Sequence, residues 1–495
     1  MIQDLDRLRT CHQWPAAVSA ARRGAARLPT ALAIALVAGT VAIAGGATNA
    51  TGLPDPSPAA EPSRTDRAAT SGRAEPAPVF PLDVRPGERY LVDAAGKPFF
   101  IHGDTAWSLI AELSREEVDL YLDDRRARGF NTLLIKLIEA LFATYAPANA
   151  YGQLPFLVPA DFSTPNEAYF DHAEWVLRRA AERGFLVLLV PSFTGWGGGE
   201  EGWYRAMVAN GAARLQQYGR YLGRRYRDFA NILWVHAGDY NPPNKDLVRA
   251  IATGIRELDP HALHTVHGAP ETAAMDYWQD EPWLEVNTIY TYEPAHVAAM
   301  EQYARPERRP FFLIESTYEN EHDATEQSLR EQAYQAVLSG AAGQVFGNNP
   351  IWHFDGPGLY RAPVIWREAL NSRGSKSMAH LHDLWATIPW WLLEPDLDQT
   401  LLTGGLGSEQ ERAVAARTSD RSLAIVYIPS NREITLDLSE LAGPAVRARR
   451  YDPSDGSLAS IDGSPFPAAG LRRFAPMGNN SSGFADWLLI LESPA

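Results

Sequence analysis

Two acidic residues, Asp239 and Glu315, each stand at the end of an apolar run. Their side-chain type and their position make them the strongest candidates for catalytic residues. The run that begins at Asn231 is typical of a strand buried on both faces in a parallel sheet. Because side chains alternate along a strand, the inward faces should carry Leu233, Val235, Ala237 and Asp239 in one strand, and Phe311, Leu313 and Glu315 in another. Taken alone, Asp239 could equally cap the following helix.

The pair predicts glycoside hydrolysis if both carboxylates open onto the mouth of one barrel. That reaction needs a protonated acid for the departing oxygen and an ionised partner that attacks the anomeric carbon or activates water. A retaining pair stands about 5–5.5 Å apart and an inverting pair roughly 6.5–9.5 Å apart.

Aromatic residues follow most of the other predicted strands. Each ring alone is more often a packing residue, but flat apolar rings gathered after several strands favour a sugar-binding cleft. The predicted substrate-binding residues are Asp104, Trp107, Lys136, Trp196, Tyr240, His267, Tyr290, Tyr292, Tyr318 and Trp352.

Lys136 lies within an apolar run, where an isolated buried ammonium would be costly. It should either reach the barrel mouth or be paired. We expect it to contact an acidic sugar such as a uronate. A lysine that snorkels from a strand end is the alternative.

The sequence carries no motif of metal or nucleotide chemistry. H-E-x-x-H, G-x-S-x-G and Walker motifs do not occur, and the glycines between 195 and 202 lack the G-x-G-x-x-G register. His264 and His267 are three apart on a predicted strand and should face opposite ways. We therefore predict no metal site and no organic cofactor.

Short apolar runs alternate with helical periodicity over residues 80–393. Eight runs are typical of strands: 98–107, 130–140, 185–193, 231–242, 263–268, 284–292, 310–319 and 343–354. A capping box at Ser114 and Glu117 opens the first long helix. The pattern predicts an α/β fold, a (β/α)8 TIM barrel. A doubly wound open sheet is the alternative, but the first turn, at Gly103, is no glycine-rich phosphate loop.

After a Trp-rich helix predicted over 381–393, the pattern changes to short strands separated by turns. This indicates a small all-β sandwich over residues 394–495. The junction around Trp390 and Trp391 has no Pro/Ser linker, so we expect the sandwich to pack on the barrel and stabilise it.

The pattern of the first 79 residues predicts a targeting signal followed by a linker. Arginines precede an apolar stretch and a run of small residues, which is typical of a secretory signal peptide over 1–50, with a membrane anchor as the alternative. Residues 51–79 are rich in Pro and Ala and should be disordered. The formal net charge of −15 argues against a nucleic acid or an anionic membrane as partner.

From residue 80 onward the chain resembles the apiosidase-like glycoside hydrolases of family 140. The matching motifs are GDTAW at Gly103, FN at Phe130, PNEAYFDH at Pro165, N-I-x-W…GDxNP in the fourth strand, E-x-x-Y-E at Glu315, and the strand-eight tail with Trp352. The resemblance implies that Asp239 is the acid/base and Glu315 the nucleophile. It also implies that the last hundred residues form a domain type labelled collagen-binding. Ala237 stands where relatives often carry a glycine.

These features predict a secreted or periplasmic glycosidase, monomeric and with no membrane in its mature form. It would cleave an oligo- or polysaccharide of the cell wall, pectic and apiose-containing, by a retaining mechanism. Burial and the charge of Glu315 should raise the pKa of Asp239, and Tyr290 or Tyr292 should hydrogen-bond Glu315. The alternative functional class is a non-catalytic carbohydrate- or collagen-binding protein whose barrel has lost catalytic activity. The presence of both carboxylates favours the enzyme.

Overall fold

The computed structural model describes residues 77–493, and these fall in one compact unit. The predicted signal peptide and most of the predicted linker lie outside the described residues. Among the helices of the described part, none is long and apolar enough to cross a membrane.

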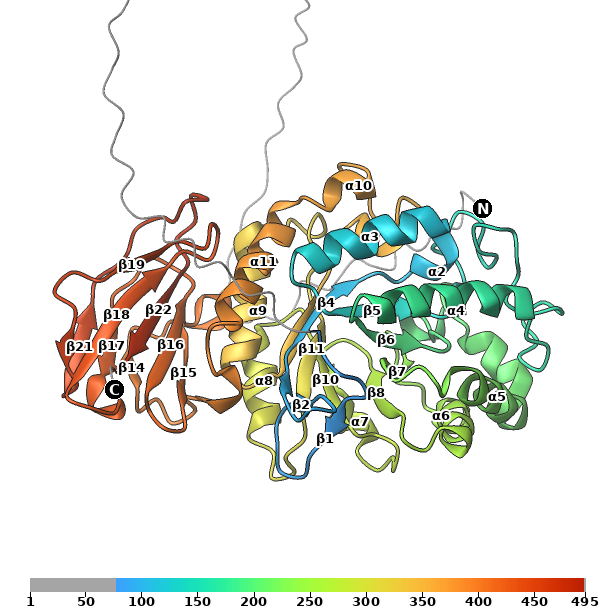
Figure 1. The fold of residues 1–495 in the computed structure, drawn as a ribbon, viewed down its shortest axis with the longest axis horizontal. Coiled ribbons are helices and arrows are strands. Elements are labelled where there is room, and N and C mark those ends of the chain that lie inside the picture. The colour runs from blue at the N-terminus through green and yellow to red at the C-terminus, as the bar shows by residue number, and fades with distance from the viewer. Residues whose placement is uncertain (1–76, 494–495) are drawn as a thin grey trace, which may run out of the picture. The chain divides into compact units, whose positions relative to one another are not determined.

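Eight parallel strands with helices around them confirm the predicted (β/α)8 fold (Figure 1). They lie in the order β8-β7-β6-β5-β4-β12-β11-β10, and the backbone N–H of Val286 donates to the carbonyl of His264 between the two end strands. The bounds are β4 Ile101–Thr105, β5 Thr132–Lys136, β6 Leu186–Val190, β7 Ile232–Ala237, β8 Leu263–His267, β10 Asn287–Tyr290, β11 Phe311–Glu315 and β12 Gly343–Phe346. A short strand, β9 (Thr272–Ala273), pairs antiparallel with β10.

The helices begin and end close to the predicted signals. They are α2 Leu109–Glu112, α3 Arg115–Ala127, α4 Glu167–Glu182, α5 Tyr204–Tyr226, α6 Asp246–Leu258, α7 Ala274–Trp278, α8 Ala295–Tyr303, α9 Glu326–Leu338, α10 Trp366–Ala369 and α11 Arg373–Trp385, with 3-10 turns η1 Trp196–Gly198, η2 Ile351–His353 and η3 Trp390–Leu392. The capping box at Ser114 and Glu117 is confirmed. The Trp-rich helix expected over 381–393 is wrong: α11 ends at Trp385, and η3 follows Pro389, which cannot continue a helix.

Two apolar clusters divide the barrel strands by face. The inner cluster takes alternate residues such as Leu134, Leu188 and Val235, and it continues down to the small antiparallel sheet of β1 (Asp83–Val84), β2 (Leu91–Val92) and β3 (Pro98–Phe99). The outer cluster takes the intervening residues and packs them against the helices. Alternation therefore determines which strand residues reach the barrel interior.

The C-terminal region is all-β, as predicted. Its larger sheet holds β13 Leu393–Pro395, β15 Val414–Thr418, β16 Leu423–Ile428, β22 Trp487–Glu492, β18 Ala445–Tyr451, β19 Leu458–Ser460 and β20 Phe466–Pro467. The smaller sheet holds β14 Leu402–Gly404, β17 Ile434–Asp437 and β21 Leu471–Phe474, and short turns are η4 Glu409–Glu411 and η5 Leu438–Glu440. Buried residues of both sheets form one shared core.

Helix α9 joins the barrel to these sheets (Figure 1). Arg330 of α9 donates from Nε and Nη2 to the two carboxylate oxygens of Asp486, at 2.7 and 2.8 Å, and both side chains are fully buried. Tyr427 and Asn480 also donate to Asp486. The sandwich packs on the barrel, as expected from the short junction.

We expect Arg330→Met to destabilise the protein by about 3–5 kcal/mol, because it leaves the Asp486 carboxylate buried without its cationic partner. Urea unfolding followed by tryptophan fluorescence measures the loss. The matched control is Arg373→Met, whose solvent-exposed guanidinium pairs with Glu326 at 3.2 Å and should contribute roughly 0–1 kcal/mol. Equal midpoints for the two variants would contradict a stabilising role for the buried pair.

Candidate active site

Asp239, His267 and Glu315 meet at the carboxyl ends of β7, β8 and β11. One atom from each side chain, a ring nitrogen or a carboxylate oxygen, lies within 4.8 Å of the other two. His267 is fully buried, Glu315 is 7% exposed and the Asp239 side chain is 23% exposed. The carboxyl ends of barrel strands are where such folds carry their chemistry.

Glu315 reaches the interior through an irregularity in β11. Phe312 and Ile314 face the inner cluster, whereas Phe311 and Leu313 face helix α8, so strict alternation would point Glu315 outward. The register shifts at this point: Ile289 pairs with Leu313, but Tyr290 pairs with Glu315. A bulge of this kind re-aims the next side chain. The predicted shared face of Phe311, Leu313 and Glu315 is therefore wrong, although Glu315 is where it was expected.

Asp239 also reaches the mouth by a route that alternation does not describe. Strand β7 ends at Ala237, and Ala237, Gly238 and Asp239 all have positive φ, of 62°, 135° and 52°. A Cβ at Gly238 would stand 2.2 Å from the ring of Phe193, so only glycine fits there. The chain turns sharply and places the carboxyl beside His267.

His267 bridges the two carboxyl groups. Its Nε2 lies 2.7 Å from Oε2 of Glu315, and its Nδ1 lies 3.3 Å from the backbone nitrogen and 3.7 Å from Oδ1 of Asp239. Burial disfavours the imidazolium, but the hydrogen bond and charge of Glu315 outweigh it and raise the pKa of His267. His264 faces the other way and pairs with His236, as the spacing predicted.

Asp239 has the properties of an acid. Burial, and then the negative charge of Glu315, raise its pKa to about 7, although His267 and Lys136 oppose the shift. Its Oδ1 is shielded from solvent and finds no hydrogen-bond partner among the described residues. The carboxyl can thus hold a proton near neutral pH.

Aromatic side chains form the wall around this centre. Trp107 donates its indole N–H to the hydroxyl of Tyr318 at 3.0 Å, and its ring lies 5.5 Å from that of His267. The ring of Tyr290 lies 4.9 Å from His267, and the Tyr290 and Tyr292 hydroxyls are 2.9 Å apart. At Oε2 of Glu315, the hydrogen-bond partner is His267, at 2.7 Å.

Lys136 lies in the barrel interior but is paired there. Its Nζ lies 3.3 Å from Glu139 Oε2, both side chains are almost fully buried, and the ring of Phe193 is 4.3 Å away. Glu139 is held in turn by Ser108. This pairing disfavours the expected contact between Lys136 and a uronate, because the lysine lies beneath the mouth and is already paired. Its positive charge instead opposes the rise in the pKa of Asp239.

The remaining predicted residues fall in different places. Asp104 points to the outer face of β4, where Tyr121 donates to it and Arg125 lies 3.5 Å away, so it belongs to the barrel–helix packing and not to the mouth. Trp352 donates to Glu321 and packs against Phe142. Tyr240 follows β7 and lies beside Tyr204, the first residue of α5, and beside Gly198. Gly198 belongs to the glycine-rich loop, which also carries the half-buried Trp196.

Two further carboxyl groups flank the pair and escaped the sequence analysis. Glu201 is 5% exposed, and its negative charge raises the pKa of Asp239. Burial, and to a smaller extent the charge of Glu315, raise the pKa of Glu321 to about 8, although the Trp352 hydrogen bond opposes this. Both lie in loops that follow barrel strands, and that position was the signal available.

The same three side chains could also hold a metal ion. Within residues 77–493, no other group of three suitable side chains was found besides Asp239, His267 and Glu315. Two carboxylates and an imidazole suit several divalent ions. However, Nε2 of His267 already lies at hydrogen-bond distance, 2.7 Å, from Oε2 of Glu315.

Known proteins share this architecture. A family model described as "Apiosidase-like, catalytic domain" matches residues 85–392, and one described as "Putative collagen-binding domain of a collagenase" matches residues 397–492. A solved structure described as a glycoside hydrolase is 27% identical, with a TM-score of 0.74, and the match covers 84% of this chain and 97% of that one. A glycoside hydrolase family 5 structure from Bacteroides vulgatus is 26% identical, with a TM-score of 0.73, over 84% and 95% of the two chains. No curated protein matches the chain.

The first family model spans more than half of the chain and includes all three residues of the carboxylate–histidine centre. The two structures match both the barrel and most of the C-terminal sheets, since each covers 84% of the chain. The chain therefore belongs to the apiosidase-like family, and it is a glycoside hydrolase.

Proposed function

We propose that the protein is a retaining glycosidase in which Glu315 is the nucleophile and Asp239 the acid/base. The observation that carries this proposal is the short separation of the two carboxyl groups, with one oxygen of each within 4.8 Å. A retaining pair stands about 5–5.5 Å apart, whereas an inverting pair leaves room for a water at roughly 6.5–9.5 Å.

In the first step, an oxygen of Glu315 attacks the anomeric carbon while Asp239 gives its proton to the departing oxygen. The bond between the anomeric carbon and that oxygen breaks, and the sugar becomes esterified to Glu315. His267 holds the attacking carboxylate by a 2.7 Å hydrogen bond.

The same electrostatics support the second step. The charge of Glu315 contributes to the raised pKa of Asp239, and that charge disappears once the sugar is attached. The pKa of Asp239 then falls, so the carboxylate can take a proton from water. The water oxygen attacks the anomeric carbon and releases Glu315.

We propose a cell-wall glycan as the substrate, pectic and apiose-containing, acted on outside the cytoplasm. The support is the apiosidase-like family match and the basic, apolar and small-residue pattern of the first 50 residues. A screen of the purified protein against pectic and other cell-wall glycans, with Glu315→Gln as the blank, tests this. Sugar released from apiose-bearing pectin by the parent alone supports it. Release from other glycans only would contradict it.

We expect kcat/KM to fall as pH rises through about 7, because the acid must be protonated and Asp239 has its pKa near that value. Since the folded-state pKa is raised, the active form is present below this pH and is lost above it. Measuring kcat/KM over a pH series, with a natural substrate that has a poor leaving group, gives the alkaline limb of the profile. A flat profile to pH 9 would contradict the assignment of Asp239 as the acid.

We expect full activity after dialysis against EDTA. Asp239 needs its proton, and His267 needs its hydrogen bond to Glu315, for the mechanism above. Assays before and after dialysis, with added zinc or calcium as the control, measure this. Loss of activity that a divalent cation restores would instead indicate that the centre works as a metal site.

A further inference from the structure

A hollow lies at the end of the barrel opposite the candidate active site, where the strands begin. It is bounded by the turn before β2, the end of α8, the loop before β12, η3 with β13, and Ser419. We call it the basal hollow. Its volume is about 150 Å³, so it has room for more than a single water.

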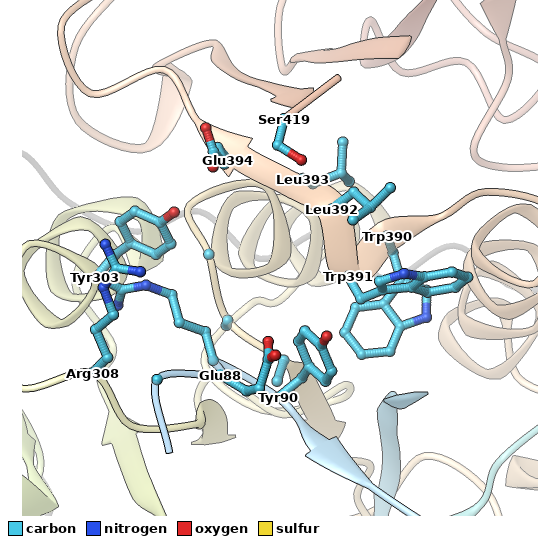
Figure 2. A pocket seen from close by; sticks show the side chains of 15 residues that line it. Glu88, Tyr90, Tyr303, Arg308, Trp390, Trp391, Leu392, Leu393, Glu394 and Ser419 are labelled. Atoms are coloured by element: carbon cyan, nitrogen blue, oxygen red, sulfur yellow. The ribbon is translucent and has the colours of Figure 1, made fainter. Parts of the chain in front are cut away.

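Side chains of different chemistry surround the basal hollow (Figure 2). Tyr303 and Arg308 stand on one side and Trp390 and Trp391 on the opposite side. In the same view, Glu88 and Tyr90 lie below the hollow, and Glu394 and Ser419 lie above it.

Four charged residues line the basal hollow, and no ion pair joins any two of them. Within residues 77–493, none of Glu88, Arg89, Arg308 and Glu394 takes part in an ion pair. The guanidiniums of Arg89 and Arg308 are close enough for Arg308 to help lower the pKa of Arg89, after burial, which is the larger cause. Two guanidiniums and two carboxylates thus line one space without an ion pair among them.

This arrangement suits a ligand whose groups both donate and accept hydrogen bonds. A sugar hydroxyl can accept from a guanidinium and donate to a carboxylate at the same time. The two positive and two negative side chains cancel, so an uncharged sugar fits better than a uronate.

The aromatic walls are held in place before any ligand arrives. Trp391 is 39% exposed, and its ring meets that of Trp390 edge-on at 6.1 Å, while Trp390 meets Tyr90 at 5.8 Å. Tyr303 lies 3.8 Å beneath the Arg89 guanidinium. A Cβ at Gly340 would stand 2.2 Å from the Tyr303 ring, so glycine makes room for it. An exposed tryptophan beside fixed polar groups is an open stacking face.

We propose that the basal hollow binds one uncharged sugar residue of a glycan, apart from the active site. The sugar's C–H face lies on Trp391, and its hydroxyls contact Arg308 and Glu394. The proposal rests on the proposed function only for the class of ligand. It would hold a glycan chain near the enzyme without taking part in bond cleavage.

The test is affinity electrophoresis of the full chain carrying Glu315→Gln, in native gels that contain arabinan, galactan or polygalacturonate. We expect retardation in at least one neutral gel, and Trp391→Ala should raise the apparent Kd there at least fivefold. Trp391→Phe, which keeps a flat ring, should retain binding, whereas Arg308→Ala and Glu394→Ala should each weaken it. In the active chain, Trp391→Ala should leave kcat/KM for an aryl glycoside unchanged.

Several results would overturn the proposal: free migration of the Glu315→Gln chain in both neutral gels, retardation by polygalacturonate alone, or equal retardation with Trp391→Ala. Circular dichroism of Trp391→Ala and Trp391→Phe shows whether both remain folded. Failure of the catalytic proposal is distinguishable, because it would appear as turnover that survives Glu315→Gln and would not affect the gels.

Discussion

Replacing Glu315 by glutamine should lower turnover of the natural glycan by at least about 10⁴-fold, the scale seen when a covalent nucleophile is removed. The amide cannot attack the anomeric carbon, but its oxygen can still accept the His267 hydrogen bond, so the centre should keep its geometry. Initial rates and circular dichroism of the purified variant measure both effects.

Glu321→Gln is the matched control for that variant. It makes the same chemical change at a neighbouring carboxyl, and the amide oxygen can still accept from Trp352. We expect it to lose less than about tenfold, within the effect of a group that assists without reacting. If Glu315→Gln kept near-parental activity, or if the two variants lost equal activity, Glu315 would not be the nucleophile.

Asp239→Asn should lower turnover of poor leaving groups by about 10²–10⁴-fold, the usual contribution of a general acid. With an activated aryl glycoside, the variant should regain most of the rate of the first step, because the leaving group of that substrate needs little help from a proton. The second step still lacks its base, so glycosylated enzyme should accumulate. Burst kinetics with a dinitrophenyl glycoside, set beside steady-state rates on the natural glycan, measure the contrast.

The dependence on leaving group is the decisive part of the Asp239 experiment. Equal losses for activated and natural substrates would mean that Asp239 supports the structure of the centre and not proton transfer. Glu201→Gln is a useful companion variant, since removing its negative charge should lower the pKa of Asp239 and move the alkaline limb to lower pH.

The barrel and its order of strands were predictable because apolar runs and capping signals are local. The positions of Asp239 and Glu315 at the strand ends were predictable for the same reason. The stated route to those positions was not correct in either case. A bulge opposite Ile289 turns Glu315 inward, and three residues with positive φ turn Asp239. Alternation of side chains cannot anticipate such breaks.

The partners of the predicted residues depended on contacts between distant segments. Lys136 is paired with Glu139 by a turn that no periodicity encodes, and Asp104 is drawn outward by Tyr121 and Arg125 on helix α3. His267 was named among the sugar-binding residues, but it lies between the two carboxyl groups because β8 adjoins β7 and follows the same inward alternation. The family resemblance supplied the roles of the carboxylates and could not supply this bridge.

The most direct test of a retaining carboxylate pair is the configuration of the first product. Proton NMR, recorded within minutes of adding enzyme to a glycan or aryl glycoside that it cleaves, resolves the anomeric signal before mutarotation. The short separation between Asp239 and Glu315 predicts that the released sugar first appears with the anomeric configuration of the substrate. First appearance of the opposite anomer would contradict the covalent role of Glu315 and make it the base of an inverting enzyme.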